Sequence, residues 1–166
     1  MGMSRVRSST DWRPAMARTL CAAGAACSTW PMFEIDPAFL TTSEPLGDLP
    51  LCHARLQADA RYPWIVLIPR VPGAVELEDL AASNRAALMD EVLAAGRAVR
   101  ALGAPVDKLN LGALGNITRQ LHVHVIGRRV GDPAWPGPVW GHSPAEAYGP
   151  EELARTVAAA KAALGL

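Results

Sequence analysis

Two of the four histidines in this chain stand two positions apart in a segment of branched aliphatic residues. If residues 120–126 form a strand, the side chains of Gln120, His122 and His124 project from one face, because side chains alternate between faces. The opposite face is then apolar and consists of Leu121, Val123 and Val125. Residues on the same face lie about 7 Å apart, so both imidazoles can reach one small anion. This spacing suits chemistry on a phosphate group.

A His-x-His pair by itself also fits two simpler interpretations. The histidines can be half-exposed strand residues, or two ligands of a metal ion such as zinc. A metal site is disfavoured because no nearby Cys, Asp or Glu stands at a recognisable ligand spacing. The choice between these interpretations therefore depends on the sequence on either side of the two histidines.

Three further segments carry a recognisable pattern. Gly115 and Asn116 stand just before the His strand, residues 62–70 read as an apolar strand that ends in Pro-Arg, and residues 132–141 are rich in Pro and Trp. Together with the His strand they resemble the histidine triad (HIT) family, whose signature is His-φ-His-φ-His-φ-φ with φ apolar. The resemblance covers roughly residues 32–166. Gln120 stands at the first His position, as it does in a bacterial branch often called diadenosine tetraphosphate hydrolase-like.

The resemblance implies an α+β domain with a HIT-like fold. We expect an antiparallel sheet of about five strands packed against a long helix, with a second helix at the C-terminus. The resemblance also implies a homodimer that binds a nucleotide and uses neither a metal nor another cofactor. The implied activity is that of a nucleotidyl hydrolase or transferase, which cleaves at the α-phosphate of a dinucleoside polyphosphate, a phosphoramidate or another adenylated conjugate.

Three side chains receive catalytic roles under this hypothesis. His122 attacks the α-phosphorus and forms a covalent nucleotidyl-histidine intermediate, which water then cleaves. His124 donates a hydrogen bond to a nonbridging phosphate oxygen and stabilises charge in the transition state. Gln120 orients the leaving group or the substrate phosphate, but its amide cannot shuttle a proton near pH 7.

The resemblance also indicates residues that bind the substrate. Gly115 and Asn116 would line the phosphate pocket with backbone N–H groups and the Asn116 amide, although a Gly-Asn pair also suits a plain turn. Asn110, on the preceding strand, is a further expected contact. The family usually places Asn or Asp in the turn that contacts the ribose. Here Ala58 is followed by Asp59, and we expect Asp59 to take that role.

Two other functions stay open from the sequence. The chain can be a nucleotide-binding protein with little turnover, in which Gln120 has left a pocket without efficient catalysis. It can also be a small metal-dependent enzyme that uses His122 and His124 as ligands, although the missing further ligands disfavour this.

Composition limits the class of protein. With 166 residues, half of them apolar, the chain has room for one domain with a sizeable core. Its formal net charge is zero, so it has no global field to attract nucleic acid or an anionic membrane. Three cysteines without a Cys-x-x-Cys pair argue against a disulfide framework and favour a reducing cytoplasm. No apolar run approaches the roughly 20 residues that span a bilayer.

The first half of the chain divides into an unusual leader and the start of a sheet. Residues 1–31 carry four arginines against one acid, and we expect a misassigned start or a disordered extension without function. Residues 33–50 are expected to be loop-rich, because Pro and Gly recur there. Residues 51–57 and 64–68 then read as an antiparallel hairpin. His53, on its first strand, is expected to be a surface or packing residue.

The clearest helix follows Ser83, which we expect to be its cap. An apolar stripe at three- and four-residue steps should pack on the sheet: Leu88, Val92, Ala95, Val99 and Leu102. Met89 and Leu93 are likewise expected in the core. A strand is predicted at 108–114 and an amphipathic C-terminal helix at 150–164, with Pro150 in its first turn.

The segment after the His strand has two open interpretations. Arg128 and Arg129 are expected to be solvated surface charges, with contact to a polyphosphate tail as the alternative. Trp135 and Trp140 either cover the core or close over the nucleotide. His142, just beyond, is expected on the surface.

Overall fold

A five-stranded antiparallel sheet forms the centre of the computed structural model, which describes residues 32–166. Its strands lie in the order β1-β2-β3-β5-β4, and each pairs antiparallel with its neighbours. Their bounds are Ser43–Asp48 for β1, Cys52–Gln57 for β2, Trp64–Pro69 for β3, Lys108–Gly112 for β4 and Val123–Arg128 for β5. The predicted α+β fold and the predicted hairpin, β2 and β3, are confirmed.

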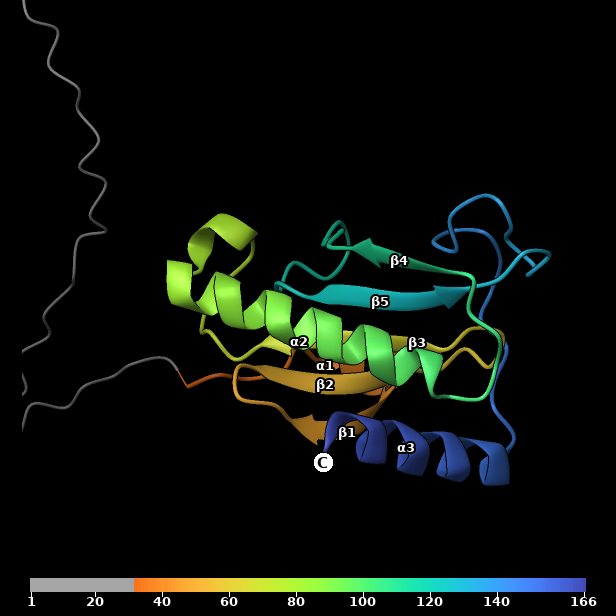
Figure 1. Cartoon of the computed structure of the whole chain (residues 1–166). Coiled ribbons are helices and arrows are strands. Elements are labelled where there is room, and N and C mark those ends of the chain that lie inside the picture. The colour runs from red at the N-terminus through yellow and green to blue at the C-terminus, as the bar shows by residue number, and fades with distance from the viewer. Residues whose placement is uncertain (1–31) are drawn as a thin grey trace, which may run out of the picture. The chain divides into compact units, whose positions relative to one another are not determined.

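Two long helices accompany the sheet. Helix α2, Ala82–Arg100, crosses one face of the sheet and packs against β5 and β3 (Figure 1). Helix α3, Pro150–Leu164, packs against α2 and the edge strand β1. Two short helices complete the fold, α1 at Pro37–Thr42 and the 3₁₀-helix η1 at Leu77–Asp79. The long helix and the C-terminal helix are therefore confirmed.

The core has two parts, one on each face of the sheet. The larger part lies under α2, where the predicted stripe is buried against the apolar side of β5 and against Leu121, two residues before that strand: Leu88, Val92, Ala95 and Val99 meet Leu121, Val123 and Val125. The smaller part lies on the opposite face and is rich in aromatic side chains: Phe39, Tyr62, Trp64, Val66, Ile68, Ile126, Ala134 and Val139. We call this second group the aromatic cluster. It lies on the face of the sheet that carries His124.

Residues 33–50 are more regular than predicted. They contain α1 and β1, because the Pro and Gly residues occupy positions that tolerate them. Pro37 is in the first turn of α1, where its missing N–H is not needed, and the Asp36 side chain accepts a hydrogen bond from Ala38 N at 2.9 Å. Pro45 and Gly47 lie in an edge strand, at an irregularity of its pairing with β2.

Two details predicted for α2 are wrong. The helix begins at Ala82 with Ala81 at the N-cap, so Ser83 lies inside the first turn and does not cap it. Met89 and Leu93 are each 55% exposed and do not fill the core, because they lie outside the stripe that faces the sheet.

Residues 1–31 lie outside the described part of the chain, and the prediction for them stays untested. Among the helices of residues 32–166, none has the length and apolar character needed to cross a membrane.

Candidate active site

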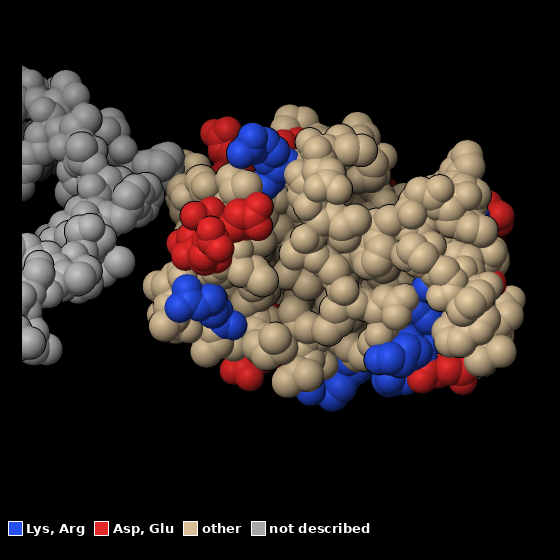
Figure 2. All heavy atoms as spheres, turned by 90° about the horizontal axis from the view of Figure 1, so that it is seen from above, with Lys and Arg blue, Asp and Glu red and all other residues tan. Residues whose placement is uncertain are grey.

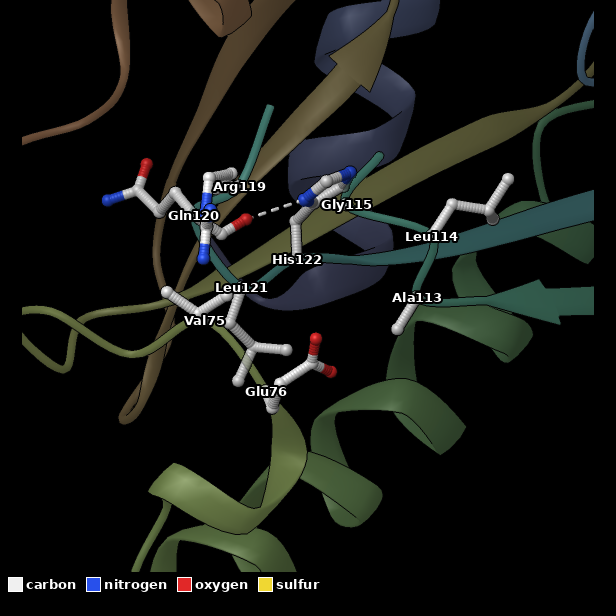
Figure 3. A pocket seen from close by; sticks show the side chains of 9 residues that line it. All are labelled: Val75, Glu76, Ala113, Leu114, Gly115, Arg119, Gln120, Leu121 and His122. Atoms are coloured by element: carbon white, nitrogen blue, oxygen red, sulfur yellow. Dashed lines mark hydrogen bonds between the residues drawn. The ribbon is translucent and has the colours of Figure 1, made fainter. Parts of the chain in front are cut away.

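His122 is held just before β5, one residue ahead of the first paired position of that strand. Its ring is buried, with 6% of the residue exposed, and its Nδ1 lies 2.7 Å from the backbone carbonyl oxygen of Gln120 (Figure 3). A carbonyl oxygen only accepts hydrogen bonds, so Nδ1 carries the proton. The lone pair of Nε2 is therefore free for another partner. Phe39 of α1 packs edge-on against the same ring, with centroids 5.0 Å apart.

His124 has the opposite tautomer. The indole Nε1–H of Trp64 donates to His124 Nδ1 at 3.0 Å. Because an indole N–H can only donate, Nδ1 must be unprotonated and the proton must be on Nε2. The two imidazole rings are adjacent, with centroids 4.8 Å apart and planes at 86°. One histidine thus offers a lone pair and its neighbour offers an N–H.

Electrostatics keep His124 neutral. Burial lowers its pKa, and the nearby charge of His122 lowers it further, to about 3. A neutral imidazole with its proton fixed on Nε2 is a hydrogen-bond donor over the whole physiological pH range. The side chain of His124 can therefore stabilise negative charge without changing its own protonation state.

Gln120 does not continue the row of histidines. Its side-chain Nε2 donates to the carbonyl of Glu34 at 2.7 Å, and its Oε1 accepts from Asp36 N at 2.9 Å. In Figure 3 the amide points away from the His122 ring, although the Gln120 carbonyl faces that ring. The strand begins at Val123, so the alternation predicted from residue 120 does not hold there. Residues 33–36, which we call the strap, take up the amide.

The turn before His122 supplies the predicted glycine. Gly115 has φ +66°, a conformation that favours glycine, and it lines a small pocket together with Gln120, Leu121 and His122 (Figure 3). Asn116 is exposed at the same turn. Gly115 therefore lies beside the nucleophile candidate, and contact of either residue with a phosphate stays a prediction.

Asn110 and Arg128 belong to one buried network. Arg128 is 1% exposed; its Nε and Nη2 donate to the Asp132 carboxylate at 2.7 Å each, and its Nη1 donates to Asn110 Oδ1 at 2.8 Å. The prediction of a solvated Arg128 is wrong, because Asp132 four residues later supplies a buried counter-charge. Arg129 is exposed as expected. The Asn110 oxygen is thus already used by Arg128.

Asp59 lies in the turn between β2 and β3 and is 3% exposed. Its carboxylate pairs with Arg61, with Oδ2 2.6 Å from Nη2. It also accepts from the backbone N–H of Arg61 at 3.2 Å. The turn adjoins the end of β3 at which Trp64 pairs with Ile126. Val123, the residue after His122, pairs with Leu67 toward the opposite end of β3. The expected contact of Asp59 with a ribose stays a prediction.

The Trp-rich segment contributes one ring to the site. Trp140 packs edge-on against His124 at 5.7 Å between centroids, and its indole N–H is buried without a hydrogen-bond acceptor in residues 32–166. Trp135 is 38% exposed and lies beside the Arg128 guanidinium. His142 is exposed as expected, and His53 pairs with Asp48 at 2.6 Å.

In the described residues, no three His, Cys, Asp or Glu side chains gather closely enough to hold a metal ion.

A comparison of the chain with curated proteins finds no match. A family model described as the HIT domain matches residues 41–131. The chain belongs to the histidine triad family. The resemblance stated from the sequence is thereby confirmed at the level of the family.

Solved structures of HIT proteins agree with this assignment. The chain is 40% identical to a histidine triad protein from Bradyrhizobium japonicum, with a TM-score of 0.77, over 81% of this chain and 99% of that one. It is 41% identical to a HIT protein from Sinorhizobium meliloti, with a TM-score of 0.74, over 77% and 94% of the two chains. For a histidine triad protein from Marinobacter aquaeolei the identity is 38% and the TM-score 0.77, over 81% and 97%.

Three features of this HIT site were missed from the sequence: Trp64, Phe39 and the strap. Trp64 sits on the same face as His124 but two pairing positions away, on a strand 60 residues earlier. The sequence did contain one signal: Trp64 is an aromatic residue on the strand 64–68, on the face that the strand pairing aligns with His124. The strap gave no signal, because its partner Gln120 is 84 to 86 residues away.

Proposed function

We propose that this HIT protein is a nucleotidyl hydrolase or transferase that cleaves at the α-phosphate of a nucleoside 5′-phosphate derivative. The observation that carries the proposal is the opposite protonation of two adjacent imidazoles. His122 has a free Nε2 lone pair because Gln120 O binds its Nδ1–H, and His124 has an Nε2–H because Trp64 binds its Nδ1. A nucleophile beside a neutral donor is what attack on a phosphoryl group requires.

In the first step, the Nε2 lone pair of His122 forms a bond to the α-phosphorus. The bond from phosphorus to the leaving group breaks, and the leaving group takes the electron pair and then a proton from solvent. The product is a covalent nucleotidyl-histidine. His124 Nε2–H donates to a nonbridging oxygen as charge develops, and removal of such a donor commonly costs roughly 3 kcal/mol in the barrier.

In the second step, water attacks the same phosphorus. The phosphorus–nitrogen bond breaks, its electron pair returns to His122 Nε2, and the water proton goes to solvent. A hydroxyl acceptor in place of water would make the protein a transferase. Backbone N–H groups at Gly115 and the amide of Asn116 are proposed as further phosphate ligands, supported by the place of Gly115 beside His122 and by the exposure of Asn116 at the same turn.

The test is a search for the covalent intermediate. Incubation with a mass-tagged adenylate donor should give an acid-labile adduct on His122, and His122→Ala should abolish both the adduct and turnover. His142→Ala is the matched control, because His142 is exposed and should leave the adduct unchanged. An adduct that persists in His122→Ala would contradict the proposal. Loss of turnover with a chelator would favour the metal-dependent enzyme, and tight binding without turnover would favour the nucleotide-binding protein.

We further propose that the chain belongs to the diadenosine tetraphosphate hydrolase-like branch. Gln120 at the first triad position and the Pro- and Trp-rich residues 132–141 support this placement. Dinucleoside polyphosphates are accordingly the first substrates to test, before phosphoramidates and other adenylated conjugates. A reducing cytoplasm is the proposed location, supported by three cysteines without a Cys-x-x-Cys pair.

We propose a homodimer that forms through β4 and the adjoining side of α2. β4 is an edge strand, and Leu111 on it is 52% exposed. Leu93 of α2 is 55% exposed and lies one turn from Gly96, which is close to Leu109. Because Leu109 and Leu111 project from the same face of β4, the exposed leucines lie on one side of the molecule. Viewed from above, the side of β4, the middle of the surface carries few charged groups (Figure 2).

Light scattering tests the dimer. Leu93→Glu should convert a dimer into monomers, because a charge in an apolar interface loses its solvation. Leu40→Glu is the matched control: Leu40 is also exposed but lies on α1, away from β4. A dimer that survives Leu93→Glu, or a monomeric wild type, would contradict this interface.

A further inference from the structure

The two hydrogen bonds of the Gln120 side chain go to one extended segment. Nε2 donates to Glu34 O at 2.7 Å, and Oε1 accepts from Asp36 N at 2.9 Å. A side-chain amide has a donor and an acceptor like those of a peptide group, so it can replace one residue of a neighbouring strand. The amide of Gln120 is thus bonded to the peptide groups on either side of Ile35, as a residue of a neighbouring parallel strand would be.

The strap is more than a passing connection. Phe33 and Ile35 are partly buried and pack against the aromatic cluster. Asp36 is then the N-cap of α1, because its side chain accepts from Ala38 N at 2.9 Å. Since this last residue of the strap caps the helix, the position of the strap also determines where α1 begins.

Helix α1 returns to the nucleophile. Phe39 is 6% exposed and its ring packs edge-on against His122, 5.0 Å between centroids. The Gln120 carbonyl binds the same histidine through Nδ1–H at 2.7 Å. Gln120 therefore acts on His122 from two sides, directly through its carbonyl and indirectly through the strap, α1 and Phe39.

We propose that Gln120 is a positioning residue that latches the strap onto the segment carrying the nucleophile and does not contact the reacting phosphate. The direction of the side chain supports this role, since the amide points away from the His122 ring in Figure 3. The effect on turnover rests on the proposed function, whereas the latch itself is a property of the folded chain. The two can therefore be tested separately.

Hydrogen exchange at the Asp36 amide tests the latch without any substrate. In the full-length protein, Gln120→Leu keeps the approximate size of the side chain and removes both bonds, so exchange at Asp36 should become about tenfold faster. Gln120→Glu keeps an acceptor for Asp36 N but places an oxygen against Glu34 O, and exchange should rise by a smaller factor. Gln57→Leu, the same substitution on β2, is the control and should leave exchange at Asp36 unchanged.

Unchanged exchange in both Gln120 variants overturns the latch, whether or not the protein is an enzyme. If Gln120→Leu does not fold, Gln120→Glu decides alone, by faster or unchanged exchange at Asp36. If the wild type forms no nucleotidyl adduct, the proposed function is wrong, but the exchange measurement still decides whether the latch exists.

Steady-state kinetics then separate the latch from a contact with the leaving group. Two substrates with the same nucleotide and leaving groups of different basicity are compared in wild type and Gln120→Leu. The latch predicts the same fold-loss in kcat/KM for both substrates, with kcat falling more than KM rises, because the latch positions the nucleophile and not the bound nucleotide. A loss that grows with the basicity of the leaving group would overturn the proposal, since it would indicate that the amide assists departure.

Discussion

The indole N–H of Trp64 donates to Nδ1 of His124 at 3.0 Å, and this bond determines which nitrogen of His124 faces the phosphate site with a proton. Trp64 belongs to β3 and pairs with Ile126, while His124 pairs with Val66. The two side chains are therefore diagonal neighbours on one face of the sheet, a distance that a large aromatic side chain can bridge.

Trp64→Phe removes this donor and keeps most of the apolar contact. His124 Nδ1 can then bind a proton, so the tautomer with Nε2–H is no longer enforced. We expect kcat/KM to fall about tenfold, less than the roughly hundredfold that follows complete removal of a transition-state donor. Nitrogen chemical shifts of His124 would show the tautomer directly, and an unchanged tautomer in Trp64→Phe would contradict this account.

His124 should not titrate near neutral pH. Burial lowers its pKa, and the charge of His122 lowers it further, to about 3. Nitrogen NMR of the wild type should therefore show an unchanged, neutral His124 from pH 8 down to about pH 4. A His124 ring that gains a proton between pH 8 and about pH 4 would refute the assignment of a neutral His124.

Local patterns in the sequence were sufficient for a large part of the fold. The three- and four-residue steps of Leu88, Val92 and Val99 gave the buried side of α2, and Pro150 gave the start of α3. β5 alternates as predicted from Val123 onward. In each case the residues that determine the structure are neighbours along the chain, so their spacing alone carries the information.

The parts that sequence did not give depend on partners far along the chain. Gln120 was expected to line up with the histidines, but its amide finds Glu34 and Asp36, which are 84 or more positions away. Met89 and Leu93 are apolar but exposed, and composition cannot distinguish a core residue from one on an apolar surface. The sequence pattern therefore predicted that the two histidines lie together, but it did not predict the groups that set their tautomers.

The buried pair of Arg128 and Asp132 should be important for stability. Both side chains are 1% exposed, and two guanidinium nitrogens contact the carboxylate at 2.7 Å. Asp132→Asn leaves the buried cation unpaired, and we expect a loss of about 3 kcal/mol in the free energy of unfolding. Glu151→Gln is the control, because its pair with Arg155 is largely exposed and should contribute little. Urea denaturation measures both, and equal stability of the two variants would contradict the prediction.

The same pair predicts a pH dependence. Burial by itself would raise the pKa of Asp132, but hydrogen bonds from Arg128 and from Arg129 N–H outweigh it and lower the pKa below its ordinary value. A carboxyl whose pKa is lower in the folded state stabilises the fold above its unfolded pKa of about 3.9. That contribution is lost as pH falls through the folded pKa.

The stability difference between wild type and Asp132→Asn should therefore be constant from pH 7 to about pH 5 and should shrink below about pH 4. Asp59 also has a lowered pKa, but it is present in both proteins and cancels in the difference. Urea denaturation across this range gives the measurement. A difference that grows toward low pH would mean that the pKa of Asp132 is raised in the folded state and not lowered.

Gly127→Ala should weaken the contact between β5 and α2. A Cβ at this position would lie 2.7 Å from Val106 Cγ2, 2.8 Å from Val99 Cγ1 and 2.9 Å from Pro63 Cγ. These neighbours are β-branched side chains and a proline ring, which cannot swing aside, so the backbone has to move. We expect the free energy of unfolding to fall by about 1–3 kcal/mol.

Two other glycines provide graded controls for Gly127→Ala. At Gly96 a Cβ would meet Leu109 Cδ1 at 2.9 Å, the end of a flexible side chain, so Gly96→Ala should cost less. At Gly149 nothing lies within 4 Å and φ is −66°, so Gly149→Ala should be nearly neutral. Thermal unfolding of the three variants should rank them in this order, because the cost depends on how easily each neighbour can yield. A Gly127→Ala protein as stable as Gly149→Ala would show that α2 and β5 are packed more loosely than these distances imply.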